Sequence, residues 1–214
     1  MTVAAPATGA RVPGSRGGEP VGRRLVAWVL TVGGAIGFLA AFTLTVEKIA
    51  LLKDPSYSPS CSINPVLSCG SVMNTPQAEV FGFPNPLLGI AGFAVVTTVG
   101  VVLLTGAVLP RWLWWGLQAG VVCGLVFVHW LIFQSLYRIG ALCPYCMIVW
   151  AVMIPVFWYT TLHAVTRGNL PVPGAVRRTA SALARYHGVV LTCWYLAIAV
   201  LILERFWLYW TTLV

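Results

Sequence analysis

The chain has 214 residues, of which 59% are hydrophobic and 8% are charged, and its mean hydropathy is +0.87. This composition excludes an ordinary soluble domain and predicts an integral membrane protein with several spans of about 20 residues each. The net charge is +8, but the arginines lie in two clusters that flank apolar runs. The positive-inside rule explains that distribution, so we expect one membrane domain and no nucleic-acid partner.

The first part of the chain predicts a tail, a span and a long loop. Residues 1–24 are rich in Ala, Pro, Gly and Arg without apolar periodicity, which predicts a disordered cytoplasmic tail. Residues 25–46 form an apolar run too long for the core of a typical cleaved signal peptide, so we expect a retained first span. Residues 47–84 then form an outer loop with Cys61 and Cys69, and loops of this length are usually functional. We expect this loop to cap the membrane domain.

Four further spans are predicted after the loop, at about residues 86–109, 112–137, 143–165 and within 187–214. Between the last two, residues 166–186 contain four arginines and no acidic residue, which predicts a basic cytoplasmic loop. Both basic segments therefore lie on the same side of the membrane. This orientation places four cysteines together on the outer side: Cys61, Cys69, Cys143 and Cys146.

The motif Cys143-Pro144-Tyr145-Cys146 begins the fourth predicted span. A cysteine just before a helix lies near the free N–H groups and the positive end of the helix dipole, which favours the thiolate. The motif alone is shared by redox enzymes and metal sites. Disulfides persist outside the cytoplasm, so two cysteine pairs on that side predict a relay from a soluble dithiol to the Cys-x-x-Cys pair. Such a relay needs an electron acceptor that dissolves in the membrane, and a quinone is the obvious candidate.

The order Cys61-x7-Cys69, Phe-Gly-Phe-Pro-Asn-Pro, Cys143-Pro-Tyr-Cys146 resembles the vitamin K epoxide reductase family, in its bacterial branch and without a fused thioredoxin domain. The resemblance covers residues 25–165. It implies an all-α membrane protein with a four-helix bundle around a quinone, a cysteine-bearing loop as cap, and a fifth helix outside this core. It also implies a plasma-membrane enzyme that oxidises a separate DsbA-like thioredoxin-fold partner and reduces a quinone of the menaquinone or ubiquinone type. Such an enzyme would support disulfide-bond formation in exported proteins. The oligomeric state is unknown from the sequence, and a monomer is favoured.

The resemblance further implies a role for each cysteine. Cys61 would exchange with the partner, Cys69 would attack Cys143, and Cys146 would deliver electrons to the quinone. Asn85 matches the asparagine that hydrogen-bonds a quinone carbonyl, although it is also placed to N-cap the second span. The other expected quinone-pocket residues are Trp150, Phe81, Phe83, Met147 and Thr75. Trp150 replaces a tyrosine of the vertebrate enzymes, and an indole N–H can donate a hydrogen bond but cannot relay a proton as a phenol does.

Other functions remain open at this point. A DsbB-type oxidase also has four helices and two cysteine pairs, but there the Cys-x-x-Cys pair precedes the loop pair. The cysteines could instead ligate a metal in a transporter or metallochaperone, or form two purely structural disulfides. We predict no metal site, because outside the cell a thiolate site competes with disulfide formation. His129 is either a proton donor or a hydrogen-bonded bundle histidine, and Cys123 and Cys193 are expected to be buried as small hydrophobic residues.

Overall fold

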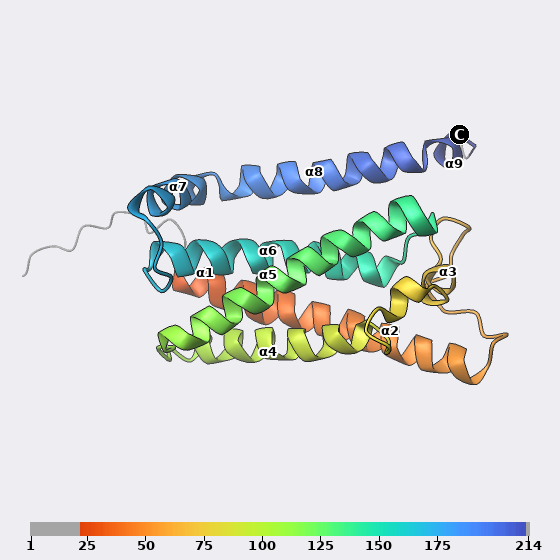
Figure 1. Cartoon of the computed structure of the whole chain (residues 1–214), viewed down its shortest axis with the longest axis horizontal. Helices are drawn as coiled ribbons and strands as arrows, with labels where there is room; N and C mark the ends of the chain where they lie inside the picture. The colour runs from red at the N-terminus through yellow and green to blue at the C-terminus, as the bar shows by residue number, and fades with distance from the viewer. Residues whose placement is uncertain (1–21, 213–214) are drawn as a thin grey trace, which may run out of the picture.

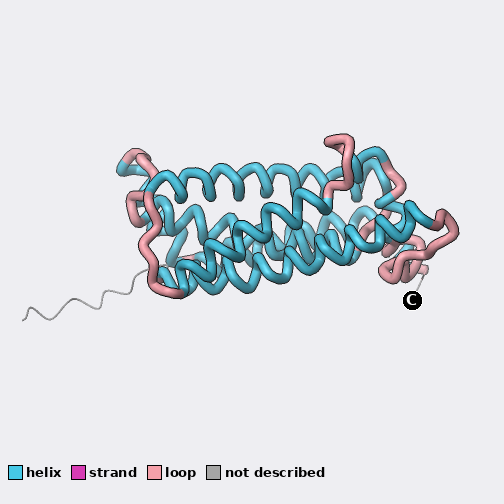
Figure 2. The backbone as a smooth tube through the Cα atoms, turned by 90° about the horizontal axis from the view of Figure 1, so that it is seen from below, coloured by secondary structure: helices cyan, strands magenta, loops and turns pink. Residues whose placement is uncertain are grey.

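The computed structural model describes residues 22–212, and in this range it contains helices and loops but no strand. Five helices are long and apolar enough to cross a membrane, and they run side by side with the loops gathered at the two ends (Figures 1 and 2). They cover Arg23–Lys53, Pro86–Leu104, Arg111–Ile139, Pro144–Thr166 and His187–Arg205. The predicted all-α membrane fold with five spans is confirmed.

Two of the spanning helices contain a π-helical turn. The first consists of α1 (Arg23–Trp28), the turn η1 (Val29–Gly33) and α2 (Gly34–Lys53). The third consists of α5 (Arg111–Gln134) and the turn η3 (Ser135–Ile139). The remaining elements are α3 (Cys69–Met73), η2 (Pro76–Glu79), α4 (Pro86–Leu104), α6 (Pro144–Thr166), α7 (Gly174–Arg185), α8 (His187–Arg205) and α9 (Trp207–Thr211).

The first spanning helix (α1, η1 and α2) and α4 approach each other closely because glycines lie between them. A Cβ atom at Gly34 would come within 2.8 Å of the Thr97 backbone nitrogen. A Cβ atom at Gly100 would come within 2.5 Å of the Thr31 backbone nitrogen. Small residues at such positions are typical of helix pairs in membranes, where close backbone approach replaces the hydrophobic effect as the source of stability.

Helix α8 lies along the outside of the bundle and has no buried residue. Side-chain hydrogen bonds attach it to α5 and α6. The Trp194 Nε1–H donates to His129 Nε2 at 3.0 Å, and the Tyr195 hydroxyl donates to the Ala151 carbonyl. The His129 Nδ1 lies 2.9 Å from the Leu125 carbonyl oxygen, so both ring nitrogens have partners. His129 is therefore a hydrogen-bonded bundle histidine that attaches the fifth helix.

Several element boundaries differ from the prediction. Helix α2 continues past residue 46 to Lys53, so Glu47 and Lys48 belong to a helix and are buried. Helix α4 ends before residue 109, because the chain turns at Gly106 with φ +92°. The basic segment 166–186 contains helix α7, and the segment 187–214 divides into α8 and α9. Of the predicted N-terminal tail, residues 1–21 lie outside the described residues.

The two ends of the bundle differ in composition. The cysteine end carries α3, the loop that follows α2 and the start of α6 (Figure 1). The opposite end, here called the arginine end, carries α7, the start of α1 and the turn before α5. All acidic residues in the described range, Glu47, Asp54, Glu79 and Glu204, belong to segments at the cysteine end.

Candidate functional site

Two neighbouring buried charges at the end of α2 hold the cysteine loop in place. Glu47 accepts hydrogen bonds from the Tyr57 hydroxyl at 2.9 Å and the Ser60 hydroxyl at 2.5 Å. The Lys48 ammonium donates to the Met73 carbonyl at 2.8 Å and pairs with Glu79 at 2.9 Å. Ser60 precedes Cys61, and Met73 ends the helix that Cys69 begins. The segment with the first cysteine pair is thus attached to α2 at both ends.

The loop is also attached to the segment before α6 by backbone hydrogen bonds. The Leu142 N–H donates to the Val66 carbonyl at 2.7 Å, and the Ser68 N–H donates to the Leu142 carbonyl at 2.8 Å. These bonds form an isolated parallel bridge between Leu67 and Leu142. Because Cys69 and Cys143 each lie just beyond a bridged segment, the bridge sets the register of the two cysteine pairs.

The four expected catalytic cysteines lie together at the cysteine end. Cys61 and Cys69 form a disulfide, and the Cys69 sulfur lies 3.2 Å from the Cys143 sulfur. Cys61, Cys69 and Cys143 are buried, and Cys146 is partly exposed. In this arrangement the Cys143 thiolate can attack Cys69 and release Cys61, and the reverse exchange passes electrons from the loop pair to Cys143. The geometry therefore permits thiol–disulfide exchange between the two pairs.

The environment of Cys143 favours its thiolate. Cys143 is the N-cap residue of α6, and its sulfur accepts a hydrogen bond from the Cys146 backbone N–H at 3.4 Å. A hydrogen bond from the Cys146 thiol, together with the N–H groups of Cys146 and Tyr145, lowers the pKa of Cys143 against the opposing effect of burial. Pro144 occupies the first helical position, where no backbone donor is lost.

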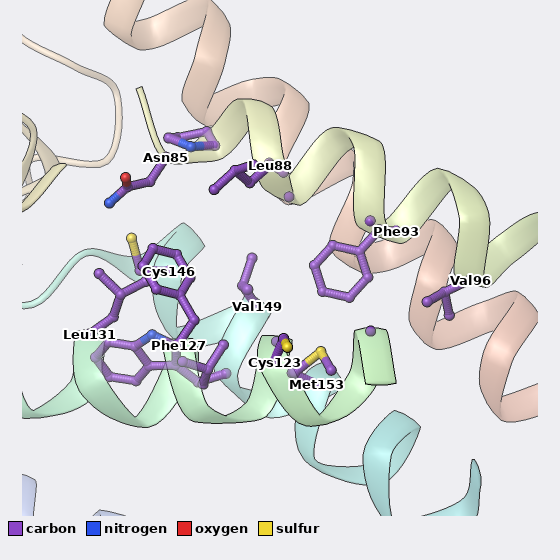
Figure 3. Close-up of a pocket in the computed structure, with 18 of the residues that line it drawn as sticks. Asn85, Leu88, Phe93, Val96, Cys123, Phe127, Leu131, Cys146, Val149 and Met153 are labelled. Carbon is purple, nitrogen blue, oxygen red and sulfur yellow. The ribbon is translucent and has the colours of Figure 1, made fainter. Parts of the chain in front are cut away.

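A cavity of about 730 Å³ begins at the cysteines and extends into the bundle. In Figure 3, Cys146, Val149 and Met153 of α6 lie opposite Leu88 and Phe93 of α4, with α5 residues along one side. The lining is almost wholly apolar. Its polar members at the cysteine end are Lys48, Asn85, Cys143, Cys146 and Trp150.

Asn85 and Trp150 bring hydrogen-bonding groups to this cavity. The Asn85 side chain does not cap α4, contrary to one interpretation of the sequence. Instead its Nδ2 donates to the Gln77 carbonyl at 2.7 Å, and its Oδ1 accepts from the Val80 N–H at 3.3 Å. The Trp150 Nε1–H is buried and has no hydrogen-bond partner among residues 22–212. An unpartnered buried donor in a cavity wall is suited to a ligand with an acceptor oxygen.

The other expected pocket residues divide into two groups. Phe81 lines the cavity and contacts the rings of Phe83 and Phe127. Phe83, Met147 and Thr75 are not among the residues that line it. The Phe83 ring contacts that of Phe81, Met147 packs against the apolar core, and the Thr75 hydroxyl donates to the Val72 carbonyl at 2.8 Å. A role for these three residues at a quinone stays a prediction.

The remaining thiols also differ from expectation. Cys123 and Cys193 are exposed on the surface of the bundle, and Cys123 lines the cavity. No group of three or more His, Cys, Asp or Glu residues within the described range is arranged to hold a metal ion.

The fifth helix contacts the segment that leads to Cys143. The Arg205 Nε–H donates to the Leu136 carbonyl in η3 at 2.7 Å. That turn ends at Gly140 (φ +71°), whose N–H bonds to the Ser135 carbonyl. Arg205 thus satisfies one of the carbonyls that the end of a helix leaves without a partner, and its positive charge complements the helix dipole.

We predict that Arg205→Gln weakens the positioning of Cys143. In a Cys61→Ser/Cys146→Ser background, the yield of the Cys69–Cys143 disulfide should fall several-fold, because the turn η3 that precedes Cys143 loses its hydrogen bond to α8. Glu204→Gln is the matched control, since no hydrogen bond or ion pair of Glu204 is found within the described range. Mass spectrometry of the cysteine peptides measures the yield, and an equal yield in both variants would contradict this role for Arg205.

The environment of Cys143 also predicts a pH dependence. Its methylthiolation by methyl methanethiosulfonate should rise with pH and reach half its maximum below the pH of an ordinary cysteine, since the thiolate is the reactive form. Cys146→Ala removes the largest stabilising contact and should move this midpoint to higher pH. Peptide mass spectrometry across a pH series checks both expectations, and a midpoint that does not change in Cys146→Ala would exclude the Cys146 thiol as the cause.

Comparison with known proteins agrees with this geometry. The family model described as the vitamin K epoxide reductase family matches residues 28–161, which is more than half of the chain and includes both cysteine pairs. No curated protein matches the chain. The family match, the five spanning helices and the paired cysteines lead to one conclusion. The chain belongs to the vitamin K epoxide reductase family and is a multi-pass membrane thiol–disulfide oxidoreductase.

Proposed function

We propose that this protein takes electrons from a separate DsbA-like thioredoxin-fold partner and passes them through Cys61/Cys69 and Cys143/Cys146 to a membrane quinone. The observation that supports this proposal is the position of Cys143. Its sulfur lies 3.2 Å from Cys69 of the loop pair, and Cys143 and Cys146 both line the apolar cavity. The Cys-x-x-Cys pair thus contacts a protein thiol system on one side and a space for an apolar acceptor on the other.

The electrons move by two exchanges within the chain. The Cys69 thiolate attacks Cys143 of an oxidised Cys143–Cys146 pair, forms a Cys69–Cys143 disulfide and releases the Cys146 thiolate. The Cys61 thiolate then attacks Cys69 and releases Cys143. The products are a Cys61–Cys69 disulfide and two thiols at Cys143 and Cys146, which is the pattern of bonds in this structure. The partner's dithiol reduces the Cys61–Cys69 disulfide and completes the cycle on the donor side.

The cavity has the chemistry that a quinone requires. Its walls suit an apolar ring and an isoprenoid tail, and the unpartnered Trp150 Nε1–H can donate to a carbonyl oxygen. The second Nδ2 hydrogen of Asn85 is a further donor at the same end. When bound there, a quinone of the menaquinone or ubiquinone type would accept two electrons and two protons. Trp150 would orient it without relaying a proton, because an indole N–H is not acidic enough to do so.

The cavity is also open toward the membrane between α4 and α5. Among its lining residues, Gly92 of α4 and Gly116 and Gly120 of α5 are exposed, and a Cβ atom at any of them would meet no atom within 4 Å. An isoprenoid tail can leave the cavity between these glycines into the lipid. This opening supports an acceptor that comes from the membrane rather than from water.

The charge distribution supports an orientation. Described arginines at the arginine end are Arg23, Arg24, Arg111, Arg167, Arg177, Arg178 and Arg185, and no described acidic residue accompanies them there. By the positive-inside rule, this end faces the cytoplasm and the cysteine end faces outward. The enzyme would then lie in the plasma (inner) membrane with its cysteine end outside the cytoplasm, and it would support disulfide formation in exported proteins.

The cysteine roles predict different losses with different electron donors. With a reduced thioredoxin-fold protein as donor and a short-chain quinone as acceptor, quinone reduction should fall to background in Cys143→Ala, Cys146→Ala and Cys61→Ala. With a small dithiol that reaches Cys143 directly, Cys61→Ala should retain activity. Cys193→Ser on α8 serves as the control. The absorbance change of the quinone measures the rate, and an unchanged rate in Cys143→Ala or Cys146→Ala would refute the relay.

The opening between α4 and α5 predicts a dependence on tail length. Gly120→Leu should slow reduction of a long-tailed quinone at least several-fold and leave a short-chain quinone nearly unaffected, because the leucine fills the path of the tail. Gly188→Leu is the matched control, since its Cβ also meets no atom within 4 Å and Gly188 lies outside the cavity. Equal effects on both quinones would show that the tail does not pass between these helices.

A further inference from the structure

Helix α7 is amphipathic and lies at the arginine end, next to the end of α6 (Figure 1). Arg178, Ser181 and Arg185 recur at the i, i+3 and i+7 positions of one face, with Arg177 beside them. Val176 and Leu183 lie on the opposite side and are exposed, at 46% and 38%. The buried Ala184 packs into the apolar core and holds the helix to the bundle.

The arginine-rich face of α7 borders a hollow of about 440 Å³. Its lining consists of Thr166, Arg177, Arg178, Ser181, Ala182 and Arg185. Helix α7 contains no acidic residue, and no carboxylate in the described part of the chain pairs with any of these three arginines. Three guanidinium groups around one hollow repel each other unless an anion lies between them. Guanidinium groups bind phosphate oxygens in a bidentate manner, so a phosphate group fits this hollow.

The position of α7 relative to the membrane indicates the source of the phosphate. Helix α6 ends at Thr166 and α8 begins at His187, so the segment between these two spans lies at the membrane surface. An amphipathic helix in this position buries its apolar side at the boundary of the acyl chains and keeps its arginines at the level of the headgroups. The positive-inside rule accounts for arginines at this end of the bundle, but it does not require three of them to surround one hollow.

We propose that this arginine hollow binds the phosphate of an anionic phospholipid in the leaflet at the arginine end. Val176 and Leu183 lie against the acyl chains, while Arg177, Arg178 and Arg185 surround the headgroup phosphate. The lipid joins the end of α6 to α7 through Thr166 and the arginines, and it therefore stabilises the folded protein. This proposal does not depend on the redox function, because the hollow is at the opposite end of the bundle from the cysteines.

The test compares full-length proteins reconstituted with phosphatidylglycerol or with phosphatidylcholine. Phosphatidylglycerol should raise the melting temperature of the unaltered protein and remain bound in native mass spectrometry, whereas phosphatidylcholine should do neither. Arg178→Gln/Arg185→Gln should lose most of the temperature shift and bind phosphatidylglycerol at least five-fold more weakly. Arg24→Gln/Arg111→Gln, which removes two charges from the same end outside the hollow, should behave as the unaltered protein does.

Three results would overturn the proposal. Equal losses in the two double variants would show a general effect of charge. An equal response to both lipids would show that the headgroup charge is not recognised. The same temperature shift with inorganic phosphate in phosphatidylcholine would make free phosphate the ligand. If the glutamine variant does not fold, Arg178→Lys/Arg185→Lys keeps the charge without the bidentate geometry, and undiminished lipid binding there would equally contradict the proposed site.

Discussion

The site depends on a short backbone contact between two segments that are far apart in the chain. The two hydrogen bonds of Leu142, to Val66 and Ser68, place a cysteine of one pair against a cysteine of the other. Side chains alone would not hold two sulfur atoms at that distance, because a long loop has many alternative conformations. Glu47 and Lys48 at the end of α2 also hold the loop that carries this bridge. Their charges are buried only because the loop supplies partners for both. The loop and the helix end thus stabilise each other.

The main features of the fold follow from local patterns. Apolar run lengths predicted five spans, and the Cys-x-x-Cys motif with its proline predicted a helix start at Cys143. Other features depend on tertiary contacts that no local pattern reports. Charged residues usually end a span, so Glu47 and Lys48 were expected in the loop. Within the helix, however, loop hydroxyls hydrogen-bond Glu47, and Glu79 pairs with Lys48.

The lining of the cavity is a second feature that local sequence patterns do not predict. Cys146 and Trp150 line the cavity, whereas Met147, next to Cys146 in the chain, does not. Which face of a helix borders a cavity is decided by packing against its neighbours, and the apolar residues of a membrane helix give no sign of it. Helix α7 did carry a signal, the spacing of Arg178, Ser181 and Arg185, but proline and glycine around it favoured a loop. No sequence pattern indicated the hydrogen bond from Arg205 to Leu136, because these residues are 69 positions apart in the chain.

The burial of three sulfur atoms has a consequence for selectivity. Cys61, Cys69 and Cys143 are each at most 5% exposed, so a small thiol in the surrounding fluid meets almost no sulfur surface. A reductant must therefore displace part of the loop to reach the Cys61–Cys69 disulfide, or reach Cys143 through the cavity that Cys143 lines. The burial of this cluster thus limits which reductants can exchange with its sulfur atoms.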